Sequence, residues 1–190
     1  SEFGADAKAG FHADSLTRRV GELAELARAD LGPLQYAKTR APVWPLVSET
    51  FSAFAPRFAA ADLHAALGAA PSRSTVDCDA DRLRQVLTNL CENCVRYVTP
   101  GGRVEVSAQA AGAELRIAID DSAPGVAAPE LARLGERFFR TDAARARQVS
   151  GAGIGLSLCR QIVEAHGGSL QFAASPLGGL RVLLTLKLEA

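Results

Sequence analysis

The stretch "TNLCENCVRY", residues 88–97, carries two asparagines, Asn89 and Asn93, four residues apart. The apolar residues around them repeat with the spacing of one buried helical face, which predicts a helix with both asparagines on a different face. An amide oxygen is a hard ligand that suits Mg²⁺ held jointly with phosphate oxygens. Arg96 follows on the same side of the helix and could meet phosphate. The alternative is that both amides merely bind solvent.

Two further stretches could contact a nucleotide. In "GAGIGL", Gly151 to Leu156, glycines at a helix start would let backbone N–H groups approach phosphate oxygens. Taken alone, a flexible turn explains that stretch equally well. In "IDDSAPGV", Asp120 and Asp121 follow a predicted strand, and one of them could accept a hydrogen bond from the exocyclic amine of adenine. The alternative is a carboxylate that caps the turn.

Helices and strands alternate along the chain in a way that could position these residues. Apolar periodicity predicts four helices: at 14–30, from about Trp44 onward, at the asparagine stretch, and in "LSLCRQIVEAH". The second helix has a stripe of core residues that includes Phe58, and Asp79 or Asp81 is the predicted cap of the third. Alternation predicts a hairpin with its turn at 111–112, and a final pair of strands separated by "PLGG". The part after Phe139 is rich in arginine and alanine and is predicted to be a mobile loop. We therefore expect an α/β fold with a helix layer on one face of a mixed, mostly antiparallel sheet.

Composition narrows the function further. The chain has 190 residues, its 21 basic and 21 acidic side chains balance, and only 6% of its residues are aromatic, which argues against a nucleic-acid partner. No apolar run is long enough to span a bilayer. Four cysteines without a second C-x-x-C pair favour free buried thiols in a reducing compartment over a metal site. The opening "SEFG", residues 1–4, is interpreted as a cloning remnant.

These motifs together resemble the N, G1, F and G2 boxes of the ATP-binding catalytic domain of bacterial sensor histidine kinases, and they occur in that order. The matching stretches are "QVLTNLCENCVRY", "DSAPG" with Asp121, "ERFFR" with Phe138 and Phe139, and "GAGIGLSL". The similarity covers about residues 42–188. It implies a two-layer α/β sandwich of the GHKL, or Bergerat, class with ATP bound between the asparagine helix and a lid at about 126–153. The details "DSAPGV" and "VEAHGG" look most like the BaeS group of envelope-stress sensors.

The resemblance implies a role for each matching residue. Asn93 is the expected Mg²⁺ ligand, and Asn89 and Arg96 are its helpers on the phosphate side. Asp121 is the expected adenine-reading carboxylate, and Arg140 the lid arginine that would neutralise the transferring phosphoryl group. The other expected nucleotide contacts are Tyr97, Gly125, Gly151, Gly153, Gly155 and Leu156.

Two departures from the family pattern bear on this expectation. Ala123 stands where the G1 box usually has its first glycine, and Arg96 replaces the common lysine. A nucleotide should still fit beside Ala123 unless that position requires a positive φ. Asn89 stands where related gyrase, mismatch-repair and chaperone ATPases carry a glutamate, and an amide cannot act as a general base. We therefore predict phosphoryl transfer to a protein side chain with little hydrolysis of ATP.

The histidine that would accept the phosphoryl group is not recognisable. Sensor kinases carry a histidine followed by an acidic residue, whereas His12, His64 and His166 are followed by Ala, Ala and Gly. His166 is interpreted instead as a helix-end residue that interacts with the helix dipole. Residues 5–33 resemble the end of the second helix of a dimerisation hairpin, and 34–190 the catalytic domain.

Several expectations about the whole protein follow from the resemblance. We expect the chain to be a monomeric cytoplasmic fragment of a bacterial inner-membrane sensor, and we expect this fragment to lack the phosphoacceptor histidine. Its expected partners are its own dimerisation domain and a response regulator. Two alternatives stay open: a nucleotide-binding or docking module of weak activity, supported only by Ala123, and a GHKL serine kinase or ATPase.

Overall fold

The computed structural model describes residues 35–146 and 153–189. The predicted helix at 14–30 and Gly151 lie outside the described residues. The chain divides into two compact units, 1–35 and 36–190, and every element below belongs to the second unit. No helix within the described ranges is long and apolar enough to cross a membrane.

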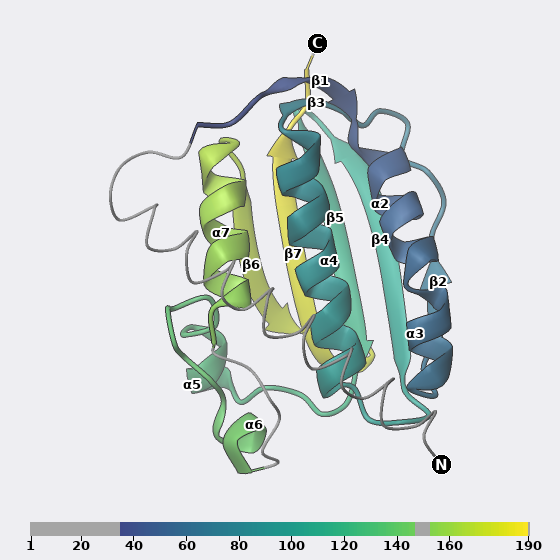
Figure 1. The fold of residues 1–190 in the computed structure, drawn as a ribbon, viewed down its shortest axis with the longest axis vertical. Coiled ribbons are helices and arrows are strands. Elements are labelled where there is room, and N and C mark those ends of the chain that lie inside the picture. Colours follow the sequence, from purple (N-terminus) through teal and green to yellow (C-terminus); the bar gives the residue numbers. More distant parts are fainter. Residues whose placement is uncertain (1–34, 147–152, 190) are drawn as a thin grey trace, which may run out of the picture. The chain divides into compact units, whose positions relative to one another are not determined.

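A five-stranded sheet forms one layer of this unit (Figure 1). In sheet order its strands are β2 His64–Leu67, β4 Arg103–Ala111, β5 Glu114–Ser122, β7 Gly178–Lys187 and β6 Ser169–Ala174. β2 pairs in parallel with β4, and the other neighbours pair antiparallel. A separate antiparallel pair joins β1 Thr39–Pro42 to β3 Thr75–Cys78.

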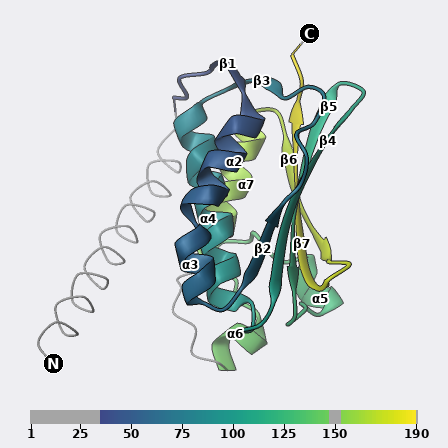
Figure 2. The same cartoon turned by 90° about the vertical axis from the view of Figure 1, so that its right-hand side faces the viewer.

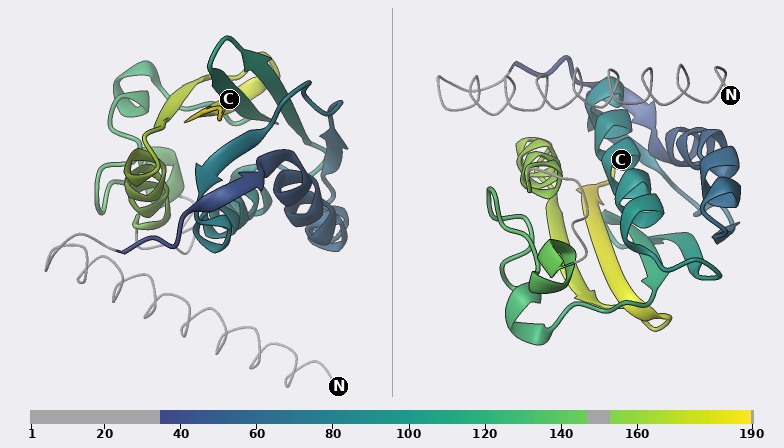
Figure 3. Two further views of the ribbon diagram at one scale, coloured as in Figure 1. Left: turned by 90° about the horizontal axis from the view of Figure 1, so that it is seen from above. Right: turned by 60° about the horizontal axis from the view of Figure 1, so that its bottom comes forward.

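Helices cover one face of the large sheet (Figures 2 and 3). They are α2 Val43–Ala53, α3 Ala55–Ala60, α4 Ala80–Tyr97 and α7 Gly155–Ala165. Two short helices, α5 Ala128–Leu131 and α6 Asp142–Ala146, lie in the segment between β5 and α7, so part of the predicted mobile loop is helical. The predicted α/β sandwich with helices on one face is confirmed.

Strict alternation along β5 fixes which of its side chains enter the core. Leu115, Ile117 and Ile119 are at most 4% exposed and share one face because successive strand residues point to opposite sides. Their pairing partners on the neighbouring strand β7 are, in the same order, Leu186, Leu184 and Val182. The β4–β5 turn occupies residues 112–113, one residue later than predicted.

The predicted helix after Trp44 is broken into α2 and α3 at Phe54. Pro56 explains the break, because its ring would clash with the carbonyl group of Ser52 and it has no N–H to donate there. The predicted core stripe is nevertheless correct, since Phe54 and Phe58 are 7% and 1% exposed. The packing of α2 and α3 thus depends on the aromatic stripe and survives the break.

The long helix α4 begins at one of the two predicted caps. The Asp79 carboxylate caps it by accepting a hydrogen bond from the Arg82 N–H at 3.1 Å. Its apolar face is buried against the sheet and its neighbouring helices, through Leu83, Val86, Leu87, Leu90, Cys91 and Cys94. Asn89 and Asn93 are held on the other side of this helix because the buried face fixes its rotation.

His166 caps the C-terminal end of α7, as predicted for a helix-end residue. Its Nε2 atom lies 2.9 Å from the Asp79 N–H and accepts that hydrogen bond. The ring proton is therefore on Nδ1, which donates to the carbonyl oxygen of Ile162 in the last helical turn at 2.6 Å. His166 consequently ties the end of α7 to the start of α4.

Candidate active site

Four predicted site residues lie on α4 toward its C-terminal end. Asn89 is buried, with 6% of its surface exposed, while Asn93, Arg96 and Tyr97 are half-buried. The Nδ2 atom of Asn89 has no hydrogen-bond partner among the described residues. A buried donor left without a partner costs about 1–3 kcal/mol. This side of α4 therefore suits a polar ligand.

Asp121 lies at an irregularity of β5, where the register with β7 shifts between Asp120 and Ser122. Its Oδ1 accepts a hydrogen bond from the Leu180 N–H at 2.7 Å. Burial raises the pKa of Asp121 to about 6, the Leu180 hydrogen bond opposes this rise, and the charge of Asp120 adds to it. Burial also raises the pKa of Cys94 on α4, and the charge of Asp121 adds to that rise, which places the carboxylate beside this helix. A poorly solvated carboxylate with spare lone pairs is suited to an incoming N–H donor.

Gly179 makes room for this carboxylate, and our sequence analysis missed it. A side chain at Gly179 would collide with Oδ1 of Asp121 and would approach the backbone oxygens of Asp121 and Ser122 to 2.6 Å. The signal in the sequence is the pair of glycines at 178–179. The predicted contact Gly125 lies close by, since a Cβ atom there would lie 3.2 Å from the Gly178 carbonyl oxygen.

The neighbouring carboxylate of Asp120 is used for structure. It is 5% exposed and receives two hydrogen bonds of 2.8 Å from the guanidinium group of Arg181. The Ser175 hydroxyl donates a third at 3.0 Å. Because its acceptor sites are filled from β7 and the β6–β7 turn, Asp120 is not available to adenine.

The predicted F and G2 boxes meet in the structure. The Phe138 N–H donates to the carbonyl oxygen of Gly153 at 3.0 Å. Gly153 has a φ of +72°, and a Cβ atom there would lie 2.8 Å from the Phe138 carbonyl carbon, so this contact requires glycine. Phe138 itself has a φ of +63° and is 63% exposed. The sequence predicted both motifs but not this contact between them.

The remaining predicted residues lie in the lid segment or at the start of α7. Arg140 donates from Nη2 to the carbonyl oxygen of Ala144, in the middle of α6, at 3.0 Å. A Cβ atom at Gly155 would meet no described atom within 4 Å, which leaves open space at the start of α7. Leu156, the next residue, is half-buried and contacts the core.

Ala123 does not need the glycine that the family usually has at its position. The described non-glycine residues with positive φ are Asp62 and Phe138, so the φ of Ala123 is ordinary. The peptide bond that follows it, to Pro124, is cis. The sequence argument for a docking module without catalysis rested on Ala123, and the backbone removes its steric basis.

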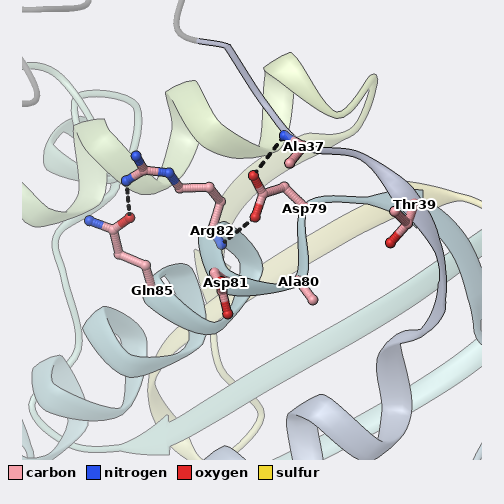
Figure 4. A pocket seen from close by; sticks show the side chains of 7 residues that line it. All are labelled: Ala37, Thr39, Asp79, Ala80, Asp81, Arg82 and Gln85. Carbon is pink, nitrogen blue, oxygen red and sulfur yellow. Dashed lines mark hydrogen bonds between the residues drawn. The ribbon is translucent and has the colours of Figure 1, made fainter.

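A separate cavity lies at the opposite end of α4 from Asn93. Its volume is about 510 Å³, and Figure 4 shows the side chains that line it. They are Ala37, Thr39, Asp79, Ala80, Asp81, Arg82 and Gln85. The sequence motifs do not predict this cavity, and none of the predicted nucleotide contacts lines it.

No group of three or more His, Cys, Asp or Glu side chains in the described ranges could hold a metal ion. The chemistry of the donor set fits Mg²⁺ only where an amide oxygen, as on Asn93, is joined by oxygens of a phosphate ligand. Cys78, Cys91, Cys94 and Cys159 are buried and free, as predicted. Burial raises the pKa of the Cys91 thiol to about 12 and also raises the pKa of the Cys94 thiol. These two thiols on α4 are therefore unreactive.

Comparison with known proteins now identifies this arrangement. Residues 78–190 match the family model for histidine kinase-, DNA gyrase B- and HSP90-like ATPases. The chain belongs to this family, and its fold is the ATP-binding fold of histidine kinase catalytic domains. The predicted resemblance is thereby confirmed.

The most informative relatives are sensor kinases. The chain is 41% identical over 175 residues to the signal transduction histidine-protein kinase BaeS of Escherichia coli K12, which covers 92% of this chain and 37% of BaeS. It is similar to full-length ShkA solved in complex with AMPPNP, with a TM-score of 0.79, 26% identity and coverage of 93% of this chain and 37% of ShkA. Histidine kinase ThkA in complex with the response regulator TrrA has the same fold, with a TM-score of 0.75, 18% identity and coverage of 93% and 49%. The chain spans about a third of the length of BaeS.

Proposed function

We propose that this chain is the catalytic ATP-binding part of a two-component sensor histidine kinase. It would transfer the γ-phosphoryl group of ATP to a histidine on a dimerisation helix. None of the three histidines of this chain matches the motif of that phosphoacceptor. The observation that carries the proposal is the α4 surface, where the unpartnered Nδ2 of Asn89 lies in the same helix face as Asn93 and Arg96. The 41% identity to BaeS supports the choice of a kinase.

Each residue of the proposed site has a chemical role. Asp121 would accept a hydrogen bond from the exocyclic amine of adenine, and Tyr97 would flank the base. Mg²⁺ would be held by the amide oxygen of Asn93 together with phosphate oxygens, and when bound it would neutralise their charge. Arg96 and Arg140 would add positive charge at the transferring group, so catalysis would rest on positioning and charge neutralisation. The open space at Gly155 supports the approach of a phosphate to the start of α7.

The family also contains ATPases, and Asn89 argues against their reaction. Hydrolysis needs a general base to activate water, and an amide cannot accept that proton. Asn89 would instead offer its buried Nδ2 donor to a phosphate oxygen. We therefore infer that the chain binds ATP and turns it over slowly unless a phosphoacceptor is present.

The partners and location of the whole protein belong to the same proposal. BaeS is a signal transduction kinase, and the ThkA complex contains a response regulator. By analogy, this chain would work with its own dimerisation hairpin and a response regulator, as the cytoplasmic part of a bacterial inner-membrane sensor.

Calorimetric titration of the 190-residue chain with ATP and ADP, with and without Mg²⁺, tests nucleotide binding. Micromolar binding that Asp121→Asn weakens without abolishing it is the expected result, and absence of binding to the folded chain would refute the proposal. Incubation with a supplied dimerisation hairpin and radiolabelled ATP tests the reaction. Acid-labile phosphohistidine is expected on the hairpin, whereas rapid ATP hydrolysis by the chain alone would indicate an ATPase.

A further inference from the structure

The pairing of β5 with β7 is interrupted at Asp121, the residue proposed to contact adenine. The register places two residues of β7, Gly179 and Leu180, opposite Asp121 alone. An extra residue on one strand is a β-bulge, which disrupts the backbone hydrogen bonds between the strands and redirects nearby side chains. Here the Asp121 carboxylate accepts the Leu180 N–H at 2.7 Å and joins the two strands through its side chain. The direction of this carboxylate therefore depends on the position of β7.

Asp120 holds β7 beside this bulge. It pairs with Arg181, whose guanidinium group donates two hydrogen bonds of 2.8 Å to the two oxygens of the Asp120 carboxylate. A two-point contact between guanidinium and carboxylate fixes orientation as well as distance. Arg181 directly follows Leu180, so this contact positions the N–H group that Asp121 accepts.

The same carboxylate orders the turn between β6 and β7. The Ser175 hydroxyl donates to Oδ1 of Asp120 at 3.0 Å and accepts a hydrogen bond from the Leu177 N–H at 3.1 Å. This turn leads to Gly178, whose carbonyl oxygen would lie 3.2 Å from a Cβ atom at Gly125. Since Gly125 is a proposed nucleotide contact, the turn that Asp120 orders lies beside the proposed site.

We propose that Asp120 is a positioning residue that holds residues 175–181 against Asp121 and so sets the preference of the site for adenine. Asp120 would not touch the nucleotide, because successive residues of β5 point to opposite faces of the sheet. With residues 175–181 fixed, one oxygen of Asp121 accepts the Leu180 N–H, and the other is aimed at the exocyclic amine of the base. When this segment is released, the amine loses its aligned acceptor. This inference rests on the proposed function, because it concerns base recognition in the same site.

Affinities of the 190-residue chain for ADP and inosine diphosphate, measured by calorimetry with Mg²⁺, test this role. Inosine carries a carbonyl oxygen where adenosine carries its exocyclic amine, so it cannot donate to Asp121. Ser175→Ala and Arg181→Gln should reduce the preference for ADP from about tenfold, the scale of one hydrogen bond to a charged group, to about twofold. The affinity for inosine diphosphate should stay nearly unchanged. Arg181→Lys, which keeps the cation but contacts the carboxylate at one point, should lie between.

Both test positions leave the Asp120 carboxylate in place, because its charge contributes to the raised pKa of Asp121. The matched control is Arg116→Ala, which removes the ion pair from Arg116 to Glu114 of the same strand at 2.8 Å. Arg116 pairs with Thr185, away from the bulge, so this variant should keep the full preference for ADP. If Ser175→Ala and Arg181→Gln weakened ADP and inosine diphosphate equally, or changed neither, the contacts of Asp120 would not set base preference and the inference would be overturned.

A measurement without nucleotide separates this inference from the proposed function. The NMR shift of the Leu180 amide proton should follow the titration of Asp121, whose pKa is raised to about 6, because this N–H donates to that carboxylate. In Arg181→Gln the shift change should shrink and exchange of the Leu180 N–H should accelerate, whereas Arg116→Ala should alter neither. If the chain bound no nucleotide but the Leu180 titration still depended on Arg181, the proposed function would fail while Asp120 kept its role in orienting Asp121. If ADP bound and the Leu180 titration were the same in every variant, the role given to Asp120 would be wrong.

Discussion

At the scale of single residues, Asp120 and Asp121 differ because successive residues of β5 point to opposite faces of the sheet. Asp121 shares the face of Ile117 and Ile119, which is the face covered by helices, so alternation alone could have assigned it to the site. The raised pKa of Asp121 could not be predicted, because it depends on burial beside Leu180 and α4. These contacts join residues far apart in the chain.

Replacing Asp120 should destabilise the fold. Asp120→Ala would leave the Arg181 guanidinium and the Ser175 hydroxyl without their acceptor, and we expect the free energy of unfolding to fall by about 2 kcal/mol. The loss should be smaller than for a fully buried pair, because the Arg181 side chain is 38% exposed. Urea denaturation measures it, and Asp120→Asn, which keeps one acceptor oxygen, should lie between. A change below about 0.5 kcal/mol, the range of ordinary surface substitutions, would contradict this assignment.

Asp121 should make nucleotide binding depend on pH. Its pKa is raised from an ordinary 3.8 to about 6, so the carboxylate loses its charge, and the proposed acceptor weakens, as the pH falls through 6. ATP affinity should therefore decrease between pH 7.5 and 5 in the unmodified chain by more than in Asp121→Asn, which controls for titration of the phosphates.

The stability of the nucleotide-free chain should change in the opposite direction. A raised pKa in the folded state means that protonation favours folding, so this contribution is full below pH 3.8 and is lost as the pH rises through 6. Relative to Asp121→Asn, the chain should become more stable as the pH falls from 7 to 4. If stability and ATP affinity changed in the same direction, Asp121 would not be the titrating acceptor.

At the scale of elements, periodic patterns in the sequence predicted α4, α7 and the β4–β5 hairpin, because each buries one regular face. The same reasoning missed β2, whose four residues are exposed or half-buried and show no alternation. β2 exists because it pairs in parallel with β4, where Leu67 aligns with Val106. A strand formed by a partner distant in sequence leaves little local pattern. Pro56, in contrast, could have predicted the break between α2 and α3.

The contact between Phe138 and Gly153 should control the order of the lid. Gly153→Ala places a Cβ atom against the Phe138 backbone at a positive φ, and should cost about 1–2 kcal/mol for the left-handed conformation. Hydrogen exchange at residues 128–146 should accelerate, while exchange in α4 stays unchanged. Gly155→Ala is the matched control, because its Cβ atom meets no described atom within 4 Å. Equal exchange in the two variants would show that this contact does not order the lid.

At the scale of the whole described unit, Asp79 joins three elements that are far apart in sequence. Its Oδ2 accepts from the Ala37 N–H at 3.0 Å, and its Oδ1 accepts from the Arg82 N–H in the first turn of α4 (Figure 4). The N–H of Asp79 itself donates to Nε2 of His166. The ring of Tyr36 packs edge-on against His166 with centroids 5.2 Å apart. The sequence predicted the cap and the helix end separately, and only the tertiary structure shows that they share one junction.

This junction should contribute more to stability than an ordinary helix cap. Burial raises the pKa of Asp79, but the N–H groups of Arg82 and Ala37 outweigh it and hold the pKa below its usual value, so the charged carboxylate is stabilised by folding. Asp79→Ala should therefore lower the free energy of unfolding by about 2 kcal/mol, the upper end for a lost cap. The loss is this large because the backbone at Ala37 loses its acceptor as well.

Asp81→Ala is the matched control for Asp79→Ala, since Asp81 is an exposed acidic residue in the same first turn and should contribute at most about 1 kcal/mol through the helix dipole. The fluorescence of Trp44, the single tryptophan, reports unfolding from α2, which lies outside the junction. Hydrogen exchange should accelerate in Asp79→Ala both at the start of α4 and at Ala37. If exchange accelerated only in α4, Asp79 would be a local cap. The segment at Ala37 would then be held by other contacts, such as that of Lys38 Nζ with the Ala165 carbonyl oxygen at 2.7 Å.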